Sequence, residues 1–200
     1  MEAEFGKFGP LVLHTRIDKD TCKKILKLCN KKNIANHKLA GHIKDQHDIN
    51  RDKYMQLIQG PLTLYMDSAL QWYKDKAFDR SLGNTWRIES AWVNYMKAGD
   101  FNPPHVHTEC LLSSVVFLKV PKGLAKERKN YVGRDLGPGK LEFLYGEDRF
   151  LHNVNMNVIP QVGDICIFPA NVRHMVAPFK CKGTRISVAA NFTIMPPPPN

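Results

Sequence analysis

The chain has 200 residues, of which 43% are hydrophobic and 24% charged, a composition that excludes disordered and fibrous proteins and fits one globular domain. No apolar run approaches the roughly 18 residues of a membrane helix, and the first residues lack the basic-then-apolar pattern of a secretory signal. The net charge of +10 favours acidic partners such as nucleic acid, but by itself it fixes no function.

The cysteines indicate reduced thiols. Their number is odd and no Cys-x-x-Cys pair is present, which argues against a disulfide framework and against a thiolate zinc site. We therefore expect an intracellular, cytoplasmic protein. The five cysteines are Cys22, Cys29, Cys110, Cys166 and Cys181.

The first part of the chain has helical periodicity. Asp18 and Asp20 are candidate N-caps of a short amphipathic helix. A second helix is predicted from about residue 51 to 76, with a break or kink at Gly60-Pro61. The apolar face of the first helix consists of Cys22, Ile25, Leu26 and Cys29.

From Thr85 the apolar pattern changes to a period of two, which is typical of strands. On an unbroken strand the even-numbered residues Trp86 to Met96 share one face. Further strands are predicted at 111–120, 141–145, 165–168, 174–177 and 185–194, with a turn at 99–104 and a surface loop at 122–139. Helices followed by many short strands predict an α+β chain with a β-rich sandwich or barrel core.

Three histidines have the spacing of a metal site. His105 and His107 are two residues apart on an extended segment and point the same way, together with Glu109. His174 follows a later strand. Imidazole nitrogens are ligands for iron, zinc, copper and nickel, so these residues are candidate ligands.

Arg185 follows His174 by eleven residues and begins another strand. Its guanidinium can bind a carboxylate through two hydrogen bonds, and Ser187 points to the same side. Asn94 lies on a strand directed at the same core, where it either contacts a ligand or serves as a buried structural amide.

Taken together, these segments resemble the 2-oxoglutarate/Fe(II)-dependent oxygenase superfamily, and most closely an oxygenase subgroup common in marine bacteria and their phages. The resemblance implies a double-stranded β-helix (a jelly roll, cupin-like) with N-terminal helices packed on one sheet. The matching segments are Leu39–Ile43, Trp92-x-Asn94, Gly99, Asn102, His105-x-His107, Leu112–Leu118, Gly163–Pro169, His174 and Arg185–Ser187.

This resemblance implies one oxygenase domain over 1–200, with a helical layer (1–84), a jelly-roll core (85–194) and a Pro-rich tail (195–200). It also implies Fe(II), 2-oxoglutarate as co-substrate, and O2. The implied reaction hydroxylates an unactivated C–H bond and releases succinate and CO2. Arg185 and Ser187 would hold the distal carboxylate of 2-oxoglutarate, and Asn94 could hydrogen-bond it. A phage-encoded chain would act in the host cytoplasm.

The sequence departs from the superfamily at the third metal ligand. The common pattern is His-x-Asp/Glu…His, whereas the second position here is His107. The third ligand is therefore His107, or Glu109 in a shifted His107-x-Glu109 pair, or water beside His105 and His174. We favour the first arrangement because His105 lies at the expected distance before the apolar strand.

Other functions stay open from the sequence. One is a metal-binding jelly roll or three-His dioxygenase that does not use 2-oxoglutarate, and another is an inactive oxygenase fold that serves as a binding module. The primary substrate is unknown, with a peptidyl or small-molecule substrate favoured. Nucleic acid is not favoured, because the demethylase branch carries a second arginine where Asn191 stands here. The loops at 122–139 and 147–160 are expected to border the mouth of the site.

Overall fold

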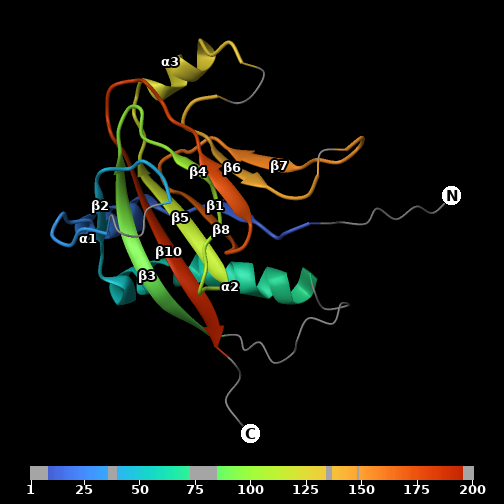
Figure 1. The fold of residues 1–200 in the computed structure, drawn as a ribbon. Helices are drawn as coiled ribbons and strands as arrows, with labels where there is room; N and C mark the ends of the chain where they lie inside the picture. Colours follow the sequence, from blue (N-terminus) through green and yellow to red (C-terminus); the bar gives the residue numbers. More distant parts are fainter. Residues whose placement is uncertain (1–8, 36–39, 73–84, 134–136, 148, 196–200) are drawn as a thin grey trace, which may run out of the picture.

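The computed structural model describes residues 9–35, 40–72, 85–133, 137–147 and 149–195. Figure 1 shows two β-sheets, with helices α1 (Lys19–Leu28) and α2 (Arg51–Trp72) against the larger one, and the short helix α3 (Leu124–Lys129) at one end. None of the helices in these ranges has the length and hydropathy that crossing a bilayer requires. All five cysteines are free thiols, as expected.

The larger sheet has six strands in the order β1-β8-β5-β10-β3-β2, and the neighbouring strands are antiparallel. The smaller sheet has the order β4-β9-β6-β7. The large-sheet strands are β1 (Leu13–Arg16), β2 (Gln46–Asp48), β3 (Thr85–Met96), β5 (Leu112–Lys119), β8 (Asp164–Pro169) and β10 (Arg185–Met195). The small-sheet strands are β4 (Asn102–His105), β6 (Leu141–Leu144), β7 (Asn155–Val158) and β9 (Arg173–Val176).

From β3 onward the chain crosses repeatedly between the two sheets. Strands β3, β5, β8 and β10 lie in the larger sheet, while β4, β6, β7 and β9 lie in the smaller one. This winding is that of a jelly roll, and it confirms the predicted double-stranded β-helix with N-terminal helices packed on one sheet.

Side chains of the central strand β10 alternate between two environments. The even-numbered residues from Val188 to Ile194 lie in the apolar core under α1 and α2. Arg185, Ser187 and Ala189 instead line a cavity between the sheets. A second apolar cluster, which includes Phe143 and Phe168, fills the rest of that space. The sheet therefore separates a packing face from a cavity face.

The N-cap of α1 is as predicted. Asp18 accepts hydrogen bonds from the backbone N–H groups of Asp20 (2.8 Å) and Thr21 (2.9 Å), so Asp20 lies in the first turn and is not itself the cap. Of the predicted apolar face, Cys22 and Ile25 are buried.

Helix α2 continues through Pro61, so the helix is not broken at Gly60-Pro61, and the alternative of a kink there stays a prediction. Tyr54 and Ile58 before the proline and Leu62 after it are fully buried against the large sheet. Their burial on both sides offsets the hydrogen bond that proline cannot donate. Residues 73–76 of the predicted helix lie outside the described residues.

A β-bulge in β3 corrects the predicted faces of that strand. The register with β10 passes from Ser90 to Ile88, which leaves Glu89 as an extra residue. Before the bulge, the even-numbered residues Trp86 and Ile88 pack in the same apolar core as the odd-numbered Ala91 after it. After the bulge, the even-numbered residues Ser90, Trp92 and Asn94 line cavities instead. The even-numbered residues of β3 therefore do not share one face.

The sequence missed the shortest elements. The predicted turn at 99–104 contains most of β4, and the predicted loop at 122–139 contains α3. Strands β1 and β2 belong to the predicted helical layer, yet they extend the large sheet at its two edges. Met195 ends β10, and tail residues 196–200 lie outside the described part of the chain.

We expect Phe192→Ala to destabilise the protein by about 3–5 kcal/mol, because Phe192 is fully buried between β10 and the helices. The free energy of unfolding in denaturant measures this loss. Leu64→Ala, at a half-exposed position of α2, is the control and should cost less than about 1 kcal/mol. Equal losses in the two variants would contradict this assignment of the core.

We also expect Gly41→Ala to be destabilising, by about 1–3 kcal/mol. A Cβ atom there would lie 2.4 Å from the Phe101 carbonyl oxygen and 2.7 Å from the Asn102 Cα, so β4 would have to move. Gly60→Ala is the control, since its Cβ would meet no atom within 4 Å. An unchanged melting temperature in Gly41→Ala would contradict the close approach.

Candidate metal centre and cofactor cavity

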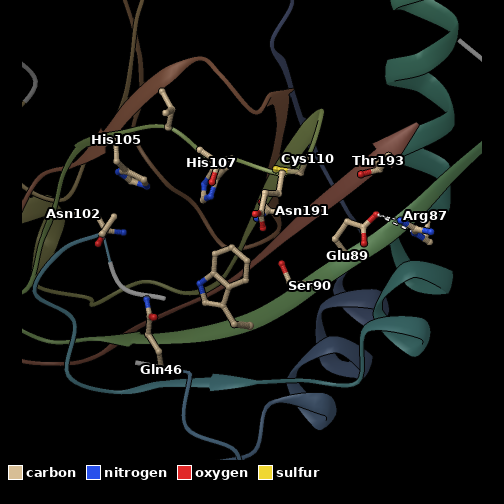
Figure 2. Close-up of a pocket in the computed structure, with 15 residues that line it drawn as sticks. Gln46, Arg87, Glu89, Ser90, Asn102, His105, His107, Cys110, Asn191 and Thr193 are labelled. Atoms are coloured by element: carbon tan, nitrogen blue, oxygen red, sulfur yellow. Dashed lines mark hydrogen bonds and ion pairs between the residues drawn. The ribbon is translucent and has the colours of Figure 1, made fainter. Parts of the chain in front are cut away.

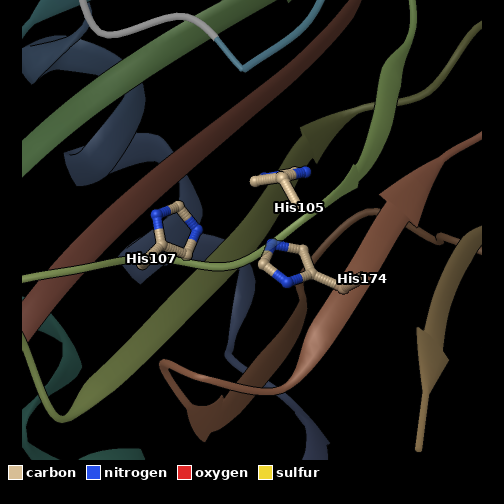
Figure 3. Close-up of side chains that lie close together, drawn as sticks. All are labelled: His105, His107 and His174. Atoms are coloured by element: carbon tan, nitrogen blue, oxygen red, sulfur yellow. The ribbon is translucent and has the colours of Figure 1, made fainter.

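Three histidines from two segments of the small sheet converge at one point (Figure 3). His105 ends β4 and lies opposite His174 of β9 in the strand register, while His107 follows two residues after His105. One ring nitrogen from each of the three lies within 4.8 Å of the others. The ring centroids of His105 and His174 are 4.3 Å apart. The sequence-predicted group is therefore brought together, in a space that one metal ion could occupy.

Backbone carbonyls orient two of the three rings. His105 Nδ1 lies 2.7 Å from the Pro103 carbonyl oxygen, and His174 Nδ1 lies 2.9 Å from the Val172 carbonyl oxygen. A carbonyl can only accept, so Nδ1 carries the proton in both rings and Nε2 retains a lone pair. This is the second-sphere arrangement that orients metal-binding histidines. The residues therefore fit a divalent metal ion.

Burial keeps these imidazoles neutral. Desolvation lowers the pKa of His174 to about 3 and that of His107 to about 4, and the neighbouring His105 ring contributes to both shifts. The pKa of His105 is also lowered by burial, against the opposing effect of the Pro103 carbonyl. Neutral rings hold the lone pairs that metal binding requires, with no proton to displace at neutral pH.

Glu109, the alternative third ligand, does not belong to the group of three among the described residues. It is exposed, has a backbone φ of 61°, and lines an outer cleft. The geometry thus assembles the all-imidazole set first considered from the sequence, and the identity of the third ligand stays a prediction.

Arg185 lies deep in the cavity and has few partners. Its side chain is only 2% exposed, and Nη1 donates to the Gly139 carbonyl oxygen at 3.1 Å. Nη2 lies 2.6 Å from the Met96 sulfur, and buried Nε has no hydrogen-bond partner. Desolvation lowers the pKa of Arg185 to about 10, so the group remains charged at neutral pH. Among the described residues no carboxylate pairs with this cation, which leaves a buried positive charge that an anionic ligand would neutralise.

The other two predicted cofactor-binding residues lie beside Arg185. Ser187 follows it on the same face of β10 and lies opposite Asn94 of β3 in the strand register. All three are buried and line an inner cavity of about 50 Å³, which the three histidines also line. One cavity therefore joins a candidate metal site to a buried cation.

An outer cleft of about 670 Å³ opens beside His105 and His107 (Figure 2). Its walls are mostly polar. The predicted loops at 122–139 and 147–160 do not line it within the described residues, and part of the first lines a separate cavity of about 1180 Å³. The other lining residues are Ala40, Gln46, Arg87, Glu89, Ser90, Trp92, Asn102, Val106, Thr108, Glu109, Cys110, Asn191 and Thr193.

Sequence reasoning missed several of these contacts. Gln46 and Asn102 lie on short strands that lack an apolar pattern. Two aromatic rings also lie beside the histidines: the Trp92 ring is 5.9 Å from that of His107, and the Phe168 ring is 4.7 Å from that of His174. Trp92 and Phe168 lie on strands of the larger sheet and line the same inner cavity as the histidines of the smaller sheet, a proximity that only the folded chain shows. Phe168 is also part of the apolar cluster between the sheets.

Comparison of solved structures finds the same fold in oxygenases. A viral collagen prolyl hydroxylase from Paramecium bursaria Chlorella virus-1, in complex with 2-oxoglutarate, has a TM-score of 0.59 at 13% identity, covering 92% of this chain and 96% of that one. A Pseudomonas putida prolyl-4-hydroxylase has a TM-score of 0.54 at 15% identity, covering 92% of both chains. A Trichoplax adhaerens prolyl hydroxylase, in complex with a hypoxia-inducible factor peptide fragment, has a TM-score of 0.55 at 12% identity, covering 93% of this chain and 84% of that one.

No curated protein matches the sequence. Residues 90–191, half of the chain, match the family described as "Putative 2OG-Fe(II) oxygenase". That segment contains the three histidines together with Asn94, Arg185 and Ser187, and the narrower resemblance to a marine and phage subgroup stays a prediction. The chain belongs to the 2OG-Fe(II) oxygenase family, with Fe(II) as its metal, 2-oxoglutarate as co-substrate, and O2.

Proposed function

We propose that this protein is a hydroxylase that inserts one oxygen atom of O2 into an unactivated C–H bond of its substrate. The other oxygen atom enters succinate as 2-oxoglutarate loses CO2, so the atoms balance. The buried, carboxylate-free Arg185 in the same cavity as three neutral histidines is the observation that carries this proposal. The whole chain, 1–200, would form the one catalytic domain.

His105, His107 and His174 would hold Fe(II), and in His105 and His174 the nitrogen that binds it would be the Nε2 atom that the backbone carbonyl contact leaves unprotonated. When bound there, Fe(II) supplies the oxygen chemistry. The protein keeps the rings neutral by burial and fixes their orientation. Phe168, packed edge-on against His174, excludes water from that side of the site.

Arg185 would bind the distal carboxylate of 2-oxoglutarate. A carboxylate accepts two hydrogen bonds from a guanidinium, and buried Nε is a donor without a partner. Ser187 would add a hydroxyl donor and Asn94 an amide donor from the adjoining strand. The co-substrate would then span the cavity from the cation to the histidines.

The primary substrate would enter through the outer cleft, whose volume of about 670 Å³ can hold a peptide segment or a small metabolite. Support for a peptide comes from the similar prolyl hydroxylase that was solved with a peptide fragment. Nucleic acid is less favoured, because Arg87, the basic residue of this cleft, is paired with Glu89 at 2.8 Å, and Glu109 adds a further negative charge. Phosphates would meet no unpaired cation there among the described lining residues.

We expect anaerobic Fe(II) and 2-oxoglutarate together to give a weak visible charge-transfer band that neither gives alone. His174→Ala should lose the band because one ring nitrogen is removed. Arg185→Met should weaken 2-oxoglutarate binding by more than about 30-fold, because a buried charge-assisted contact is lost. Titration with each component measures both effects.

Arg173→Met and His152→Ala are the matched controls and should keep the band, since neither residue lines the inner cavity. His107→Ala and Glu109→Ala then decide the third ligand, and we expect only the first to weaken Fe(II) binding. If iron binds but 2-oxoglutarate produces no band in the native protein, the proposal is wrong. The site would then be that of a three-His metal protein or an inactive relative.

A further inference from the structure

Gln46 lies in the wall between the outer cleft and the inner cavity. Its side chain is among those that line the cleft in Figure 2, whereas its partner Asn94 lines the inner cavity. Both residues are buried, with 4% and 7% exposure. Gln46 Nε2 donates a hydrogen bond to Asn94 Oδ1. This side-chain contact therefore connects the two spaces of the site.

The strand register makes this contact specific. Gln46 of β2 is directly opposite Asn94 of β3, which in turn is directly opposite Ser187 of β10. The three side chains form one row across three adjacent strands. Asn94 is thus held between a residue of the cleft wall and a residue of the predicted 2-oxoglutarate site.

The hydrogen bond from Gln46 to Asn94 Oδ1 determines which end of the planar Asn94 amide faces the inner cavity. When Gln46 engages the oxygen, the other arm of the amide, the Nδ2 donor, faces away from Gln46. The carboxylate oxygens of 2-oxoglutarate only accept hydrogen bonds. A rotated amide would present its own oxygen to an anion and repel it. The orientation of this amide therefore affects the affinity for an anionic ligand.

We propose that Gln46 is a positioning residue for 2-oxoglutarate, which fixes the Asn94 amide with its donor directed at the co-substrate. The inference rests on the proposed function, since it takes the inner cavity as the 2-oxoglutarate site. Gln46 itself does not touch the co-substrate in this arrangement. Its effect passes through Asn94.

The test uses two variants of the full chain loaded with Zn(II), so that no turnover occurs, with 2-oxoglutarate binding measured by calorimetric titration. Gln46→Leu removes the donor and leaves the amide free to rotate, so we expect Kd to rise about 3- to 10-fold. Gln46→Glu at about pH 8 replaces the donor with an acceptor. Asn94 Nδ2 then turns toward the introduced carboxylate and Oδ1 toward the ligand, and we expect Kd to rise more than about 10-fold.

Gln56→Glu, at an exposed position of α2, is the matched control for the added charge and should bind 2-oxoglutarate as the native protein does. A second readout needs neither metal nor activity. In the metal-free native protein, the side-chain NH2 resonances of Asn94, assigned with Asn94→Asp, should shift when 2-oxoglutarate is added. In Gln46→Glu they should already differ before the addition.

Unchanged Kd values in both Gln46 variants, or Asn94 NH2 resonances that are indifferent to 2-oxoglutarate in the native protein, would overturn the inference. If a variant fails to fold, the resonance shift in the native protein still decides it. If the proposed function itself were wrong, the result would be different, because the native protein loaded with Zn(II) would then not bind 2-oxoglutarate at all. If the weaker 2-oxoglutarate binding of the Gln46 variants only parallels a lower melting temperature, Gln46 has a structural role, and this result would also overturn the inference.

Discussion

The site depends on the alternation of side chains along β10, the strand near the centre of the larger sheet. Successive residues of a strand point to opposite faces, so a single strand can bury Phe192 against the helices and direct Arg185 into the cavity. A shift of one residue would exchange these faces and bury the cation in the apolar core. The packing energy of the core therefore fixes the position of the functional residues.

The winding of the jelly roll brings the two halves of the site together. Strand β4 follows a large-sheet strand and β9 precedes another, yet they pair in the small sheet and place His105 opposite His174. The three imidazoles are neutral, so a bound divalent metal would keep its full positive charge. Together with the buried guanidinium of Arg185, that metal charge would make the cavity electropositive and suited to a dicarboxylate, which is consistent with the co-substrate of the family.

Much of the fold could be predicted from periodicity and end signals. Long apolar strands such as β5 and β10, and the Asp18 cap of α1, carry strong local patterns that tertiary contacts reinforce. The incorrect predictions for β4, α2 and β3 share one cause: the structure of each of these segments depends on contacts with another part of the chain. Strand β4 is a proline-containing segment that becomes a strand through pairing with β9, and α2 passes Pro61 because both of its halves are buried. The Glu89 bulge adjusts β3 to β10 and leaves no mark on the sequence of β3 alone.

The sequence by itself determined which residue types could perform the chemistry, with His105, His107 and His174 as candidate ligands and Arg185 with Ser187 as a candidate carboxylate site, and it determined the family to which the chain belongs. Only the tertiary structure decided which of these groups meet, that Glu109 lies apart from them, and that Gln46 holds Asn94. The physical reason is that spacing along a strand fixes where a side chain points. Its neighbours, its burial and thus its pKa depend on strands that are distant in the sequence.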